Sequence, residues 1–424
     1  MRATVPGVQI PPSPPIFGFH LIDQGEKDMI DYFPNNYSWS LAISSLGCLG
    51  IPASHINRAC ASLKDVSDPG NPNASERWYQ TWTEVATRFE RGAEQDLSLG
   101  RNFSAANKFH RSAMTFLIAN RLISHKDPRQ LLSYKKGLET FQKHIIHSGE
   151  PVDFLDIPYK NTTLPALFLK SSDSEETPCL VHFDGFDMLK EFNYVNTCSA
   201  FKKRGISVLY VDHPGVGGAL RLQNLPTFPE TEIPAAAAVD YLETRKDVDK
   251  NKIGMIAQSL GGYYAPRAVA FEKRLKCCIA WGGIWDFGIR AKQLAEKSGF
   301  SEMSEKSGTG SNPSVSNFVE HFLWVFGKDT LEDALEVAKE FKVEGFLDKI
   351  TVPYLVQHGE NDRQVPLESA KKCIEGAINS PKAELKIFTI EEGSCEHCNV
   401  DDRAPAVDYM ADWAAEVLGG IKSL

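Results

Sequence analysis

The chain has 424 residues, enough for roughly two to three domains of ordinary size. Its 46 lysine and arginine residues against 55 aspartate and glutamate residues leave a formal net charge of −9, which argues against nucleic-acid binding. No apolar run approaches the length of a membrane span, so we expect a soluble cytoplasmic protein without membrane partners. The nine cysteines are odd in number and scattered, which does not indicate a disulfide framework.

Residues 1–150 are predicted to form a helical N-terminal domain. Apolar side chains recur at three- and four-residue steps over residues 77–91, where Trp78 and Trp82 share one face, and again over residues 128–146. Core packing is the favoured role of these aromatic side chains. Apolar faces of this kind also suit a cap over a neighbouring domain and self-association, so we expect a homodimer.

Residues 151–424 are predicted to form an α/β domain with a mostly parallel sheet. Short β-rich runs alternate with helical stretches, which is typical of strands covered by helices on both faces. Residues 284–350 interrupt the alternation and are expected to form a helical insertion above the strand ends, as a lid does. The expected strands are residues 152–159, 164–169, 179–183, 206–212, 253–257, 275–281, 353–358 and 384–389, with helices near 189–204, 235–245, 262–271, 368–377 and 404–418.

The sharpest local signal lies at residues 253–262, Ile-Gly-Met-Ile-Ala-Gln-Ser-Leu-Gly-Gly. An apolar strand leads into a small-X-Ser-X-Gly turn and then a helix, which is the pattern of a nucleophile elbow. Such a turn holds the Ser259 hydroxyl clear of the sheet, and small residues flank it because neighbouring backbone passes close by. Ala257 stands where the first glycine of the pattern usually lies.

Two later segments supply the partners that a serine nucleophile needs. Asp362 follows the predicted strand at residues 353–358, and His397 lies in a loop after the last predicted strand. The order Ser259, Asp362, His397 is that of α/β-hydrolases. We therefore expect Ser259 to attack, His397 to take and return its proton, and Asp362 to orient the imidazole. The alternative is a relative that keeps the fold and binds a ligand without turnover.

An oxyanion hole requires backbone N–H groups directed at the oxygen that becomes negative. Leu260 supplies one by its position immediately after the nucleophile. Phe186, in the turn after the predicted strand at residues 179–183, is expected to supply the second, because Gly185 allows the backbone to turn inward. Asp187 follows this turn, where capping of the next helix is its favoured role and contact with substrate is the alternative.

No metal or organic cofactor is expected. Cys395, His397 and Cys398 are possible ligands, but a zinc site normally draws on a second, separated cluster. The glycine-rich loop at residues 212–218 lacks the Lys-Ser/Thr ending of a phosphate-binding loop and is interpreted as a sharp turn after a strand.

Residues 258–267, Gln-Ser-Leu-Gly-Gly-Tyr-Tyr-Ala-Pro-Arg, and 277–283, Cys-Cys-Ile-Ala-Trp-Gly-Gly, resemble the fungal yellowish-green-type polyketide-shortening hydrolases. That group is related to pseudooxynicotine hydrolase and to FrsA-like esterases, and the resemblance covers nearly the whole chain. It implies an α/β-hydrolase of fungal secondary metabolism, in pigment formation for example, that cleaves a C–C bond next to a ketone, or an ester, in an aromatic polyketide. It also implies an acidic residue after the sixth strand that assists substrate, for which Asp286 is the nearest candidate.

The triad alone does not determine which bond is cleaved. Ester, thioester or lactone hydrolysis and acyl transfer use the same machinery as C–C cleavage of the retro-Claisen type. A C–C hydrolase must hold the carbonyls and phenols of its substrate with added polar groups near the nucleophile, and the candidates are Asp187, Tyr263 and Asp286. The competing interpretation is that Tyr263 packs on the helix after the elbow and that Asp286 caps the insertion.

Overall fold

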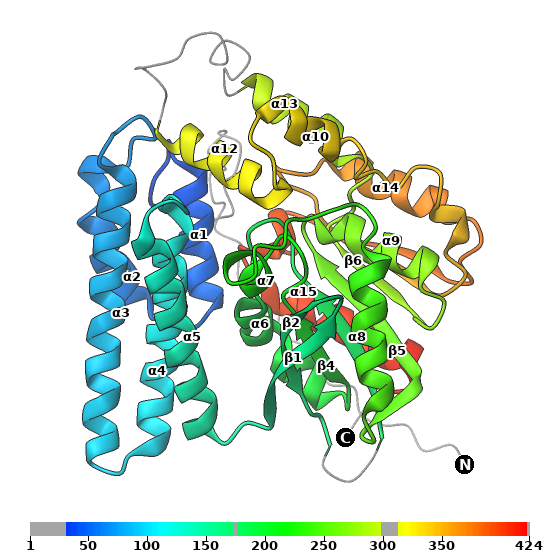
Figure 1. The fold of residues 1–424 in the computed structure, drawn as a ribbon, viewed down its shortest axis with the longest axis horizontal. Coiled ribbons are helices and arrows are strands. Elements are labelled where there is room, and N and C mark those ends of the chain that lie inside the picture. The colour runs from blue at the N-terminus through cyan, green and yellow to red at the C-terminus, as the bar shows by residue number, and fades with distance from the viewer. Residues whose placement is uncertain (1–30, 173–175, 298–312, 422–424) are drawn as a thin grey trace, which may run out of the picture.

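A bundle of helices precedes the sheet, as the helical periodicity predicts (Figure 1). The computed structural model describes residues 31–172, 176–297 and 313–421. In the bundle, helix α3 (Ala74–Ser98) extends beyond the apolar stripe predicted at residues 77–91. Its last turns contact the next helix, where Asp96 pairs with Lys108 at 2.6 Å. The helices are α1 (Tyr37–Cys48), α2 (Ala53–Ala61), α3 (Ala74–Ser98), α4 (Asn102–Ala119) and α5 (Pro128–Ser148), with short 3₁₀ turns η1 (Lys64–Val66) and η2 (Asn120–Leu122).

Helix α5 shows how local sequence sets the ends of an element. The Asp127 side chain accepts a hydrogen bond from the Arg129 amide at 2.9 Å, and Pro128 occupies the first helical position, where no amide hydrogen is needed. Gly149 ends the helix with a φ of 71°, a left-handed conformation that glycine adopts without steric cost. The chain then enters the first strand.

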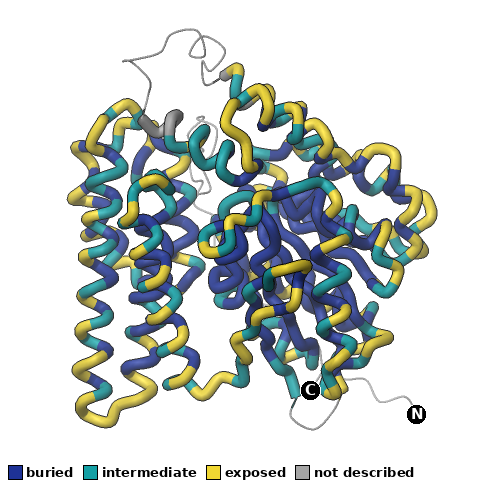
Figure 2. Tube along the Cα trace, in the orientation of Figure 1, coloured by how far each residue is buried: buried dark blue, intermediate teal, exposed yellow. Residues whose placement is uncertain are grey.

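Eight strands form one sheet in the order β1-β2-β4-β3-β5-β6-β7-β8, which confirms the predicted α/β fold. The pairs β1–β2 and β2–β4 are antiparallel, and the remaining pairs are parallel. Figure 2 shows the central strands buried on both faces, as their continuous apolar runs require. The strands are β1 (Val152–Tyr159), β2 (Thr162–Leu169), β3 (Thr177–Phe183), β4 (Ser207–Val211), β5 (Val248–Gln258), β6 (Cys278–Trp281), β7 (Tyr354–Gly359) and β8 (Ala383–Phe388).

Helices cover both faces of the sheet. One face carries α6 (Lys190–Lys203) and α15 (Arg403–Leu418), and the other carries α8 (Glu232–Thr244), α9 (Gly261–Phe271) and α14 (Leu367–Gly376). The short helix α7 (Gly217–Arg221) follows β4 through the glycine-rich loop. None of the helices in the described ranges is both long and apolar enough to pass through a lipid bilayer.

The insertion between β6 and β7 reaches across the strand ends to the helical bundle (Figure 1). Its described helices are α10 (Phe287–Lys297), α12 (Pro313–Phe326) and α13 (Leu331–Ala338), and the 3₁₀ turn η3 (Leu347–Lys349) follows them. Asn317 of α12 donates a hydrogen bond to Ser75 Oγ of α3 at 2.7 Å, and the Trp324 ring stacks on His125 with centroids 4.5 Å apart. The insertion and the bundle are therefore in direct contact above the sheet.

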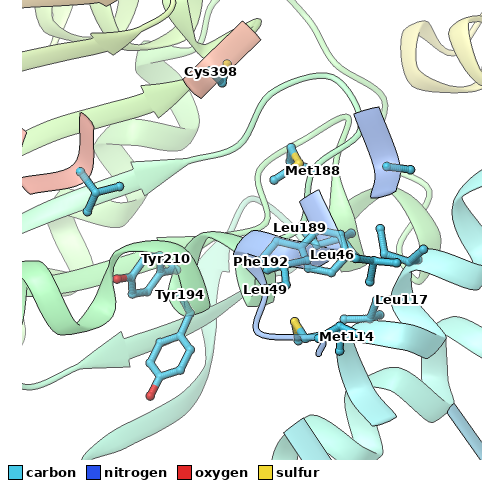
Figure 3. Close-up of a cluster of buried hydrophobic side chains, with 14 of the residues drawn as sticks. Leu46, Leu49, Met114, Leu117, Met188, Leu189, Phe192, Tyr194, Tyr210 and Cys398 are labelled. Atoms are coloured by element: carbon cyan, nitrogen blue, oxygen red, sulfur yellow. The ribbon is translucent and has the colours of Figure 1, made fainter. Parts of the chain in front are cut away.

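The bundle and the α/β part share one hydrophobic core. Figure 3 shows Leu46, Leu49 and Met114 of the bundle packed against Leu189 and Phe192, at the start of α6. The same cluster continues beneath the sheet through side chains of β4 and α15. Removing the bundle would therefore expose apolar surface on the α/β part.

A buried charge cluster lies next to the loop that follows β3. Lys190 Nζ lies 2.6 Å from a Glu191 carboxylate oxygen and 2.8 Å from Asp212 Oδ2, and all three side chains are almost fully buried. The backbone amide of Gly218 also donates to Asp212 Oδ2 at 2.7 Å. The glycine-rich loop after β4 thus wraps around a carboxylate, in agreement with its interpretation as a sharp turn.

We expect Lys190→Met to lower the free energy of unfolding by about 3–5 kcal/mol, because it leaves two carboxylates buried without their cation. Urea denaturation at pH 7 measures the change. The matched control is Lys252→Met, since Lys252 is 44% exposed and pairs with Asp249 at 3.3 Å at the surface. That control should cost at most about 1 kcal/mol. Equal losses in the two variants would contradict the proposed importance of the buried cluster.

Candidate active site

Ser259 lies on a strained turn between β5 and α9. Its φ is 59°, a left-handed conformation that is unfavourable for any residue other than glycine. The turn is held by two backbone hydrogen bonds, from the Ser259 amide to Trp281 O at 2.8 Å and from the Gly262 amide to Ser259 O at 2.7 Å. The predicted nucleophile elbow is therefore present in the structure.

The residues around the elbow are small because larger side chains would clash with neighbouring atoms. A Cβ atom at Gly262 would lie 1.7 Å from Gly282 O, and one at Gly261 would lie 2.5 Å from the Ala257 Cβ atom. Because Gly261 has no side chain, the methyl group of Ala257 is accommodated. This explains how alanine can stand at the first small position of the motif.

The structure brings the three predicted catalytic side chains together. Ser259 Oγ lies 2.9 Å from His397 Nε2, and His397 Nδ1 lies 2.8 Å from Asp362 Oδ2. The second carboxylate oxygen of Asp362 accepts hydrogen bonds from the amides of Gln364 at 2.8 Å and Val365 at 2.9 Å. A serine, a histidine and an oriented carboxylate thus form one continuous hydrogen-bonded chain.

The charges of His397 and Asp362 stabilise each other. Burial disfavours the imidazolium, but the adjacent Asp362 carboxylate and the Cys398 side chain together outweigh this and raise the pKa of His397 well above its ordinary value. Burial also disfavours the carboxylate, yet the interaction with His397 outweighs it and lowers the pKa of Asp362. Asp362 therefore remains ionised, ready to stabilise an imidazolium at His397.

The loop after β3 passes directly beside the nucleophile. A Cβ atom at Gly185 would lie 2.7 Å from both Gln258 O and the Ser259 Cβ atom, so only glycine fits there. In the part of the chain that the structure describes, the backbone amides of Phe186 and Leu260 donate no hydrogen bond to a protein acceptor. Their N–H groups are consistent with the predicted oxyanion hole, which stays a prediction.

We expect Gly185→Ala to lower kcat by about 10²- to 10³-fold, because the added methyl group displaces the loop that carries the Phe186 amide. Steady-state kinetics with an activated aryl ester measures the effect. Gly47→Ala is the control, since no atom lies within 4 Å of the position a Cβ would take in that helix. Wild-type kcat in Gly185→Ala would show that the loop does not contribute to the reaction.

A cavity of about 720 Å³ opens at the Ser259 hydroxyl, within the size range of small-molecule binding sites. Three parts of the chain enclose it: the helical bundle, the strand ends of the sheet and the insertion. The lining residues include Tyr37, Trp39 and His125 from the bundle, Phe186, Ser259 and His397 from the loops that follow strands of the sheet, and Phe287, Phe318 and Phe322 from the insertion.

Comparison with known proteins agrees with this geometry, although no family model matches the chain. The chain is 26% identical over 396 residues to the 20-hydroxy-prefusarin hydrolase of Gibberella moniliformis, covering 87% of this chain and 93% of that protein. It is 25% identical over 344 residues to the 2,6-dihydropseudooxynicotine hydrolase of Paenarthrobacter nicotinovorans, covering 80% and 84%. The crystal structure of a 2,6-dihydroxy-pseudo-oxynicotine hydrolase matches the fold with a TM-score of 0.70 at 24% identity, over 88% of this chain and 95% of that one. The chain has the α/β-hydrolase fold. These similarities confirm the resemblance to fungal secondary-metabolism hydrolases and to pseudooxynicotine hydrolase.

Two of the three predicted substrate-binding side chains line the cavity. Asp187 does so and accepts a hydrogen bond from Arg121 Nε at 3.0 Å. It does not cap the following helix, which begins at Lys190. Asp286 also lines the cavity, and its Oδ1 accepts from the Ile289 amide at 2.9 Å, so it caps α10 as well.

Tyr263, the third predicted substrate-binding residue, is not among the residues that line the cavity. Its side chain is fully buried, its hydroxyl donates to Pro229 O at 2.9 Å, and its ring centroid lies 5.1 Å from that of Phe341. The direction of the side chain on α9 decides this, because it points into the core beneath the insertion. The competing interpretation, packing on the helix after the elbow, is the one observed.

The cavity also contains arginines that sequence reasoning missed. Arg121 follows α4 and contacts Asp187 across the interface between the bundle and the α/β part, and Arg403 begins α15. No motif surrounds Arg121, so no local signal could have identified it. Arg403 stands six residues after His397, and this short distance along the chain is the one signal that could have pointed to it.

Proposed function

We propose that this α/β-hydrolase cleaves a C–C bond next to a ketone in an aromatic polyketide, by a retro-Claisen reaction through an acyl-enzyme at Ser259. The observation that carries the proposal is the hydrogen-bonded chain from Ser259 through His397 to Asp362, next to a cavity of about 720 Å³ that Ser259 and His397 line. The similarity to hydrolases named for 20-hydroxy-prefusarin and 2,6-dihydropseudooxynicotine supports a small-molecule substrate.

The chemistry follows from the positions of the groups. Ser259 Oγ attacks the ketone carbonyl while His397 Nε2 takes its proton, and the amides of Phe186 and Leu260 stabilise the resulting oxyanion. When the C–C bond breaks, its electron pair leaves with the departing carbon as an enolate or phenolate, and the His397 cation protonates it. Water then attacks the acyl-enzyme with His397 as base and releases a carboxylic acid. No external oxidant or reductant is needed.

The lining of the cavity supports an aromatic substrate. The Phe186 ring lies with its centroid 5.9 Å from that of Phe318 and 6.0 Å from that of Phe322, so the loop beside the nucleophile and the insertion form one apolar wall. Flat aromatic surfaces of this kind bind aromatic ligands by offset or edge contacts. Polar groups at Asp187 and Asp286 supply the contacts that the oxygens of a polyketide require.

The test compares cleavage of a 1,3-diketone with hydrolysis of an activated aryl ester, whose leaving group needs no stabilisation by the protein. Asp187→Asn should lower cleavage of an aromatic 1,3-diketone by about a hundredfold, because a carbanion leaving group depends on nearby polar groups. Hydrolysis of an activated aryl ester should change little. Products are identified by mass spectrometry. Asp286→Asn should reduce diketone cleavage less, because the asparagine oxygen can still accept the hydrogen bond from the Ile289 amide and so hold the side chain in place.

Tyr263→Phe is the matched control, because its hydroxyl lies outside the cavity and should not alter the ratio of the two activities. Equal loss of both activities in Asp187→Asn, or ester hydrolysis with no diketone cleavage in the unmodified protein, would favour an ester, thioester or lactone hydrolase. Failure of a fluorophosphonate to label Ser259 would favour a binding protein without turnover.

A further inference from the structure

Arg403 places an unpaired positive charge inside the cavity. It is the first residue of α15, is only 6% exposed, and lines the same cavity as Ser259. Its Nε and Nη1 atoms are buried without a hydrogen-bond partner among the described residues. The guanidinium carbon lies 5.7 Å from the centroid of the Trp281 ring.

The ionisable groups near Arg403 do not neutralise it. Asp401 is the one carboxylate among them, and its two oxygens accept hydrogen bonds from the amides of Cys395 at 2.8 Å and Glu396 at 3.0 Å. Arg121, the other cation nearby, is paired with Asp187. A buried guanidinium stays charged, and its burial without an anion is unfavourable. The N–H donors of Arg403 are therefore available to an anionic group of a ligand.

Arg403 is close to the reacting groups. The ring beneath it belongs to Trp281, whose carbonyl oxygen accepts from the Ser259 amide. Cys398, another neighbour, has its sulfur 3.5 Å from His397 Nε2 (Cys398 is labelled in Figure 3). A ligand in the cavity can therefore contact Arg403 on the side of the histidine.

The charge of the cavity differs from that of the whole chain. Three acidic side chains and five arginines line it, although the chain carries a formal net charge of −9. The arginines are Arg121, Arg221, Arg290, Arg363 and Arg403. An acidic protein with a basic cavity attracts anions to that cavity and repels them elsewhere.

We propose that Arg403 binds an acidic oxygen group of the substrate, a carboxylate or an ionised phenol. The unpartnered Nε and Nη1 of this guanidinium carry N–H donors that can form charge-assisted hydrogen bonds to an oxyanion. The proposal deepens the proposed function, because it names the substrate class for the same site: aromatic molecules that carry an acidic oxygen. Arg403 acts in binding and orientation and takes no part in bond cleavage.

Binding to the Ser259→Ala protein tests this without any turnover. The probes are 2-naphthoate, methyl 2-naphthoate and 2-naphthol, measured by calorimetry. With Arg403 present, 2-naphthoate should bind at least about tenfold more tightly than its methyl ester, as expected for a charged hydrogen bond. Adding Arg403→Met should abolish that preference, and Arg403→Lys should restore part of it.

The probes also separate the two possible acidic groups. If the phenol is the group recognised, the affinity for 2-naphthol rises as the pH passes the pKa of that phenol, and Arg403→Met removes the rise. Arg267→Met is the control, since Arg267 pairs with Glu232 outside the cavity and should leave every affinity unchanged. The melting temperature should stay the same or rise in Arg403→Met, because an unpaired buried charge is removed.

The proposal is overturned if Arg403→Met retains the preference for the anion, or if neither acidic probe is preferred when Arg403 is present. A fall in melting temperature with unchanged selectivity would assign Arg403 a structural role instead. Because binding is measured in a protein that lacks the nucleophile, absence of diketone cleavage would refute the proposed reaction and leave this result standing.

Discussion

Ser259→Ala is expected to lower turnover by about 10⁴- to 10⁶-fold while leaving the fold intact. The Ser259 hydroxyl is the group whose oxygen lies 2.9 Å from His397 Nε2, at the end of the hydrogen-bonded chain that starts at Asp362. His397→Ala should be about as damaging, and the double variant no worse, because the members of a triad act as a unit. Steady-state kinetics with an aryl ester and fluorophosphonate labelling measure the loss.

A second serine in the cavity provides the control. Ser45 lines the cavity, and its hydroxyl donates to Leu41 O of its own helix at 2.9 Å. Ser45→Ala should therefore keep activity within a few-fold of the wild type, with the same melting temperature. Near-normal activity in Ser259→Ala, or a similar loss in both variants, would refute the nucleophilic role of Ser259.

Asp362→Asn is expected to lower kcat by about 10⁴-fold, because the amide no longer stabilises the imidazolium and favours the wrong tautomer. The variant should also change the pH dependence. His397 acts as a base only when neutral, so activity is lost as the pH falls through its pKa, which Asp362 holds well above the ordinary value. Removal of the carboxylate lowers that pKa, and the acid limb of kcat/KM should move to lower pH.

The control for this shift is another buried carboxylate close to the histidine. Glu396 precedes His397 in the chain, but its oxygens accept hydrogen bonds from Asn361 Nδ2 at 3.0 Å and from Arg363 Nη2 at 2.9 Å. Glu396→Gln should leave the acid limb where it is in the wild type. An acid limb that does not move in Asp362→Asn, or that moves equally in both variants, would contradict the coupling between Asp362 and His397.

Sequence patterns were sufficient for the fold and for the order of the triad residues. Apolar runs such as Ser207–Val211 have few alternatives to a buried strand, and the predicted strand 206–212 differs from it by one residue at each end. The prediction was weaker where polarity hides a strand: β5 begins at Val248, five residues before the predicted start, because its first residues are polar and partly exposed. The predicted homodimer and the cytoplasmic location stay predictions.

Local sequence determined the elbow, the glycines around it and the loops that carry Asp362 and His397, because each depends on backbone geometry encoded within a few residues. Only the tertiary structure decided that Tyr263 points into the core, that the helical bundle shares a core with the sheet, and that Arg121 and Arg403 enter the cavity. These properties depend on side-chain direction and on contacts between segments far apart in the chain. The periodicity of apolar residues predicts local helices and strands, but it does not predict which distant segments pack against one another.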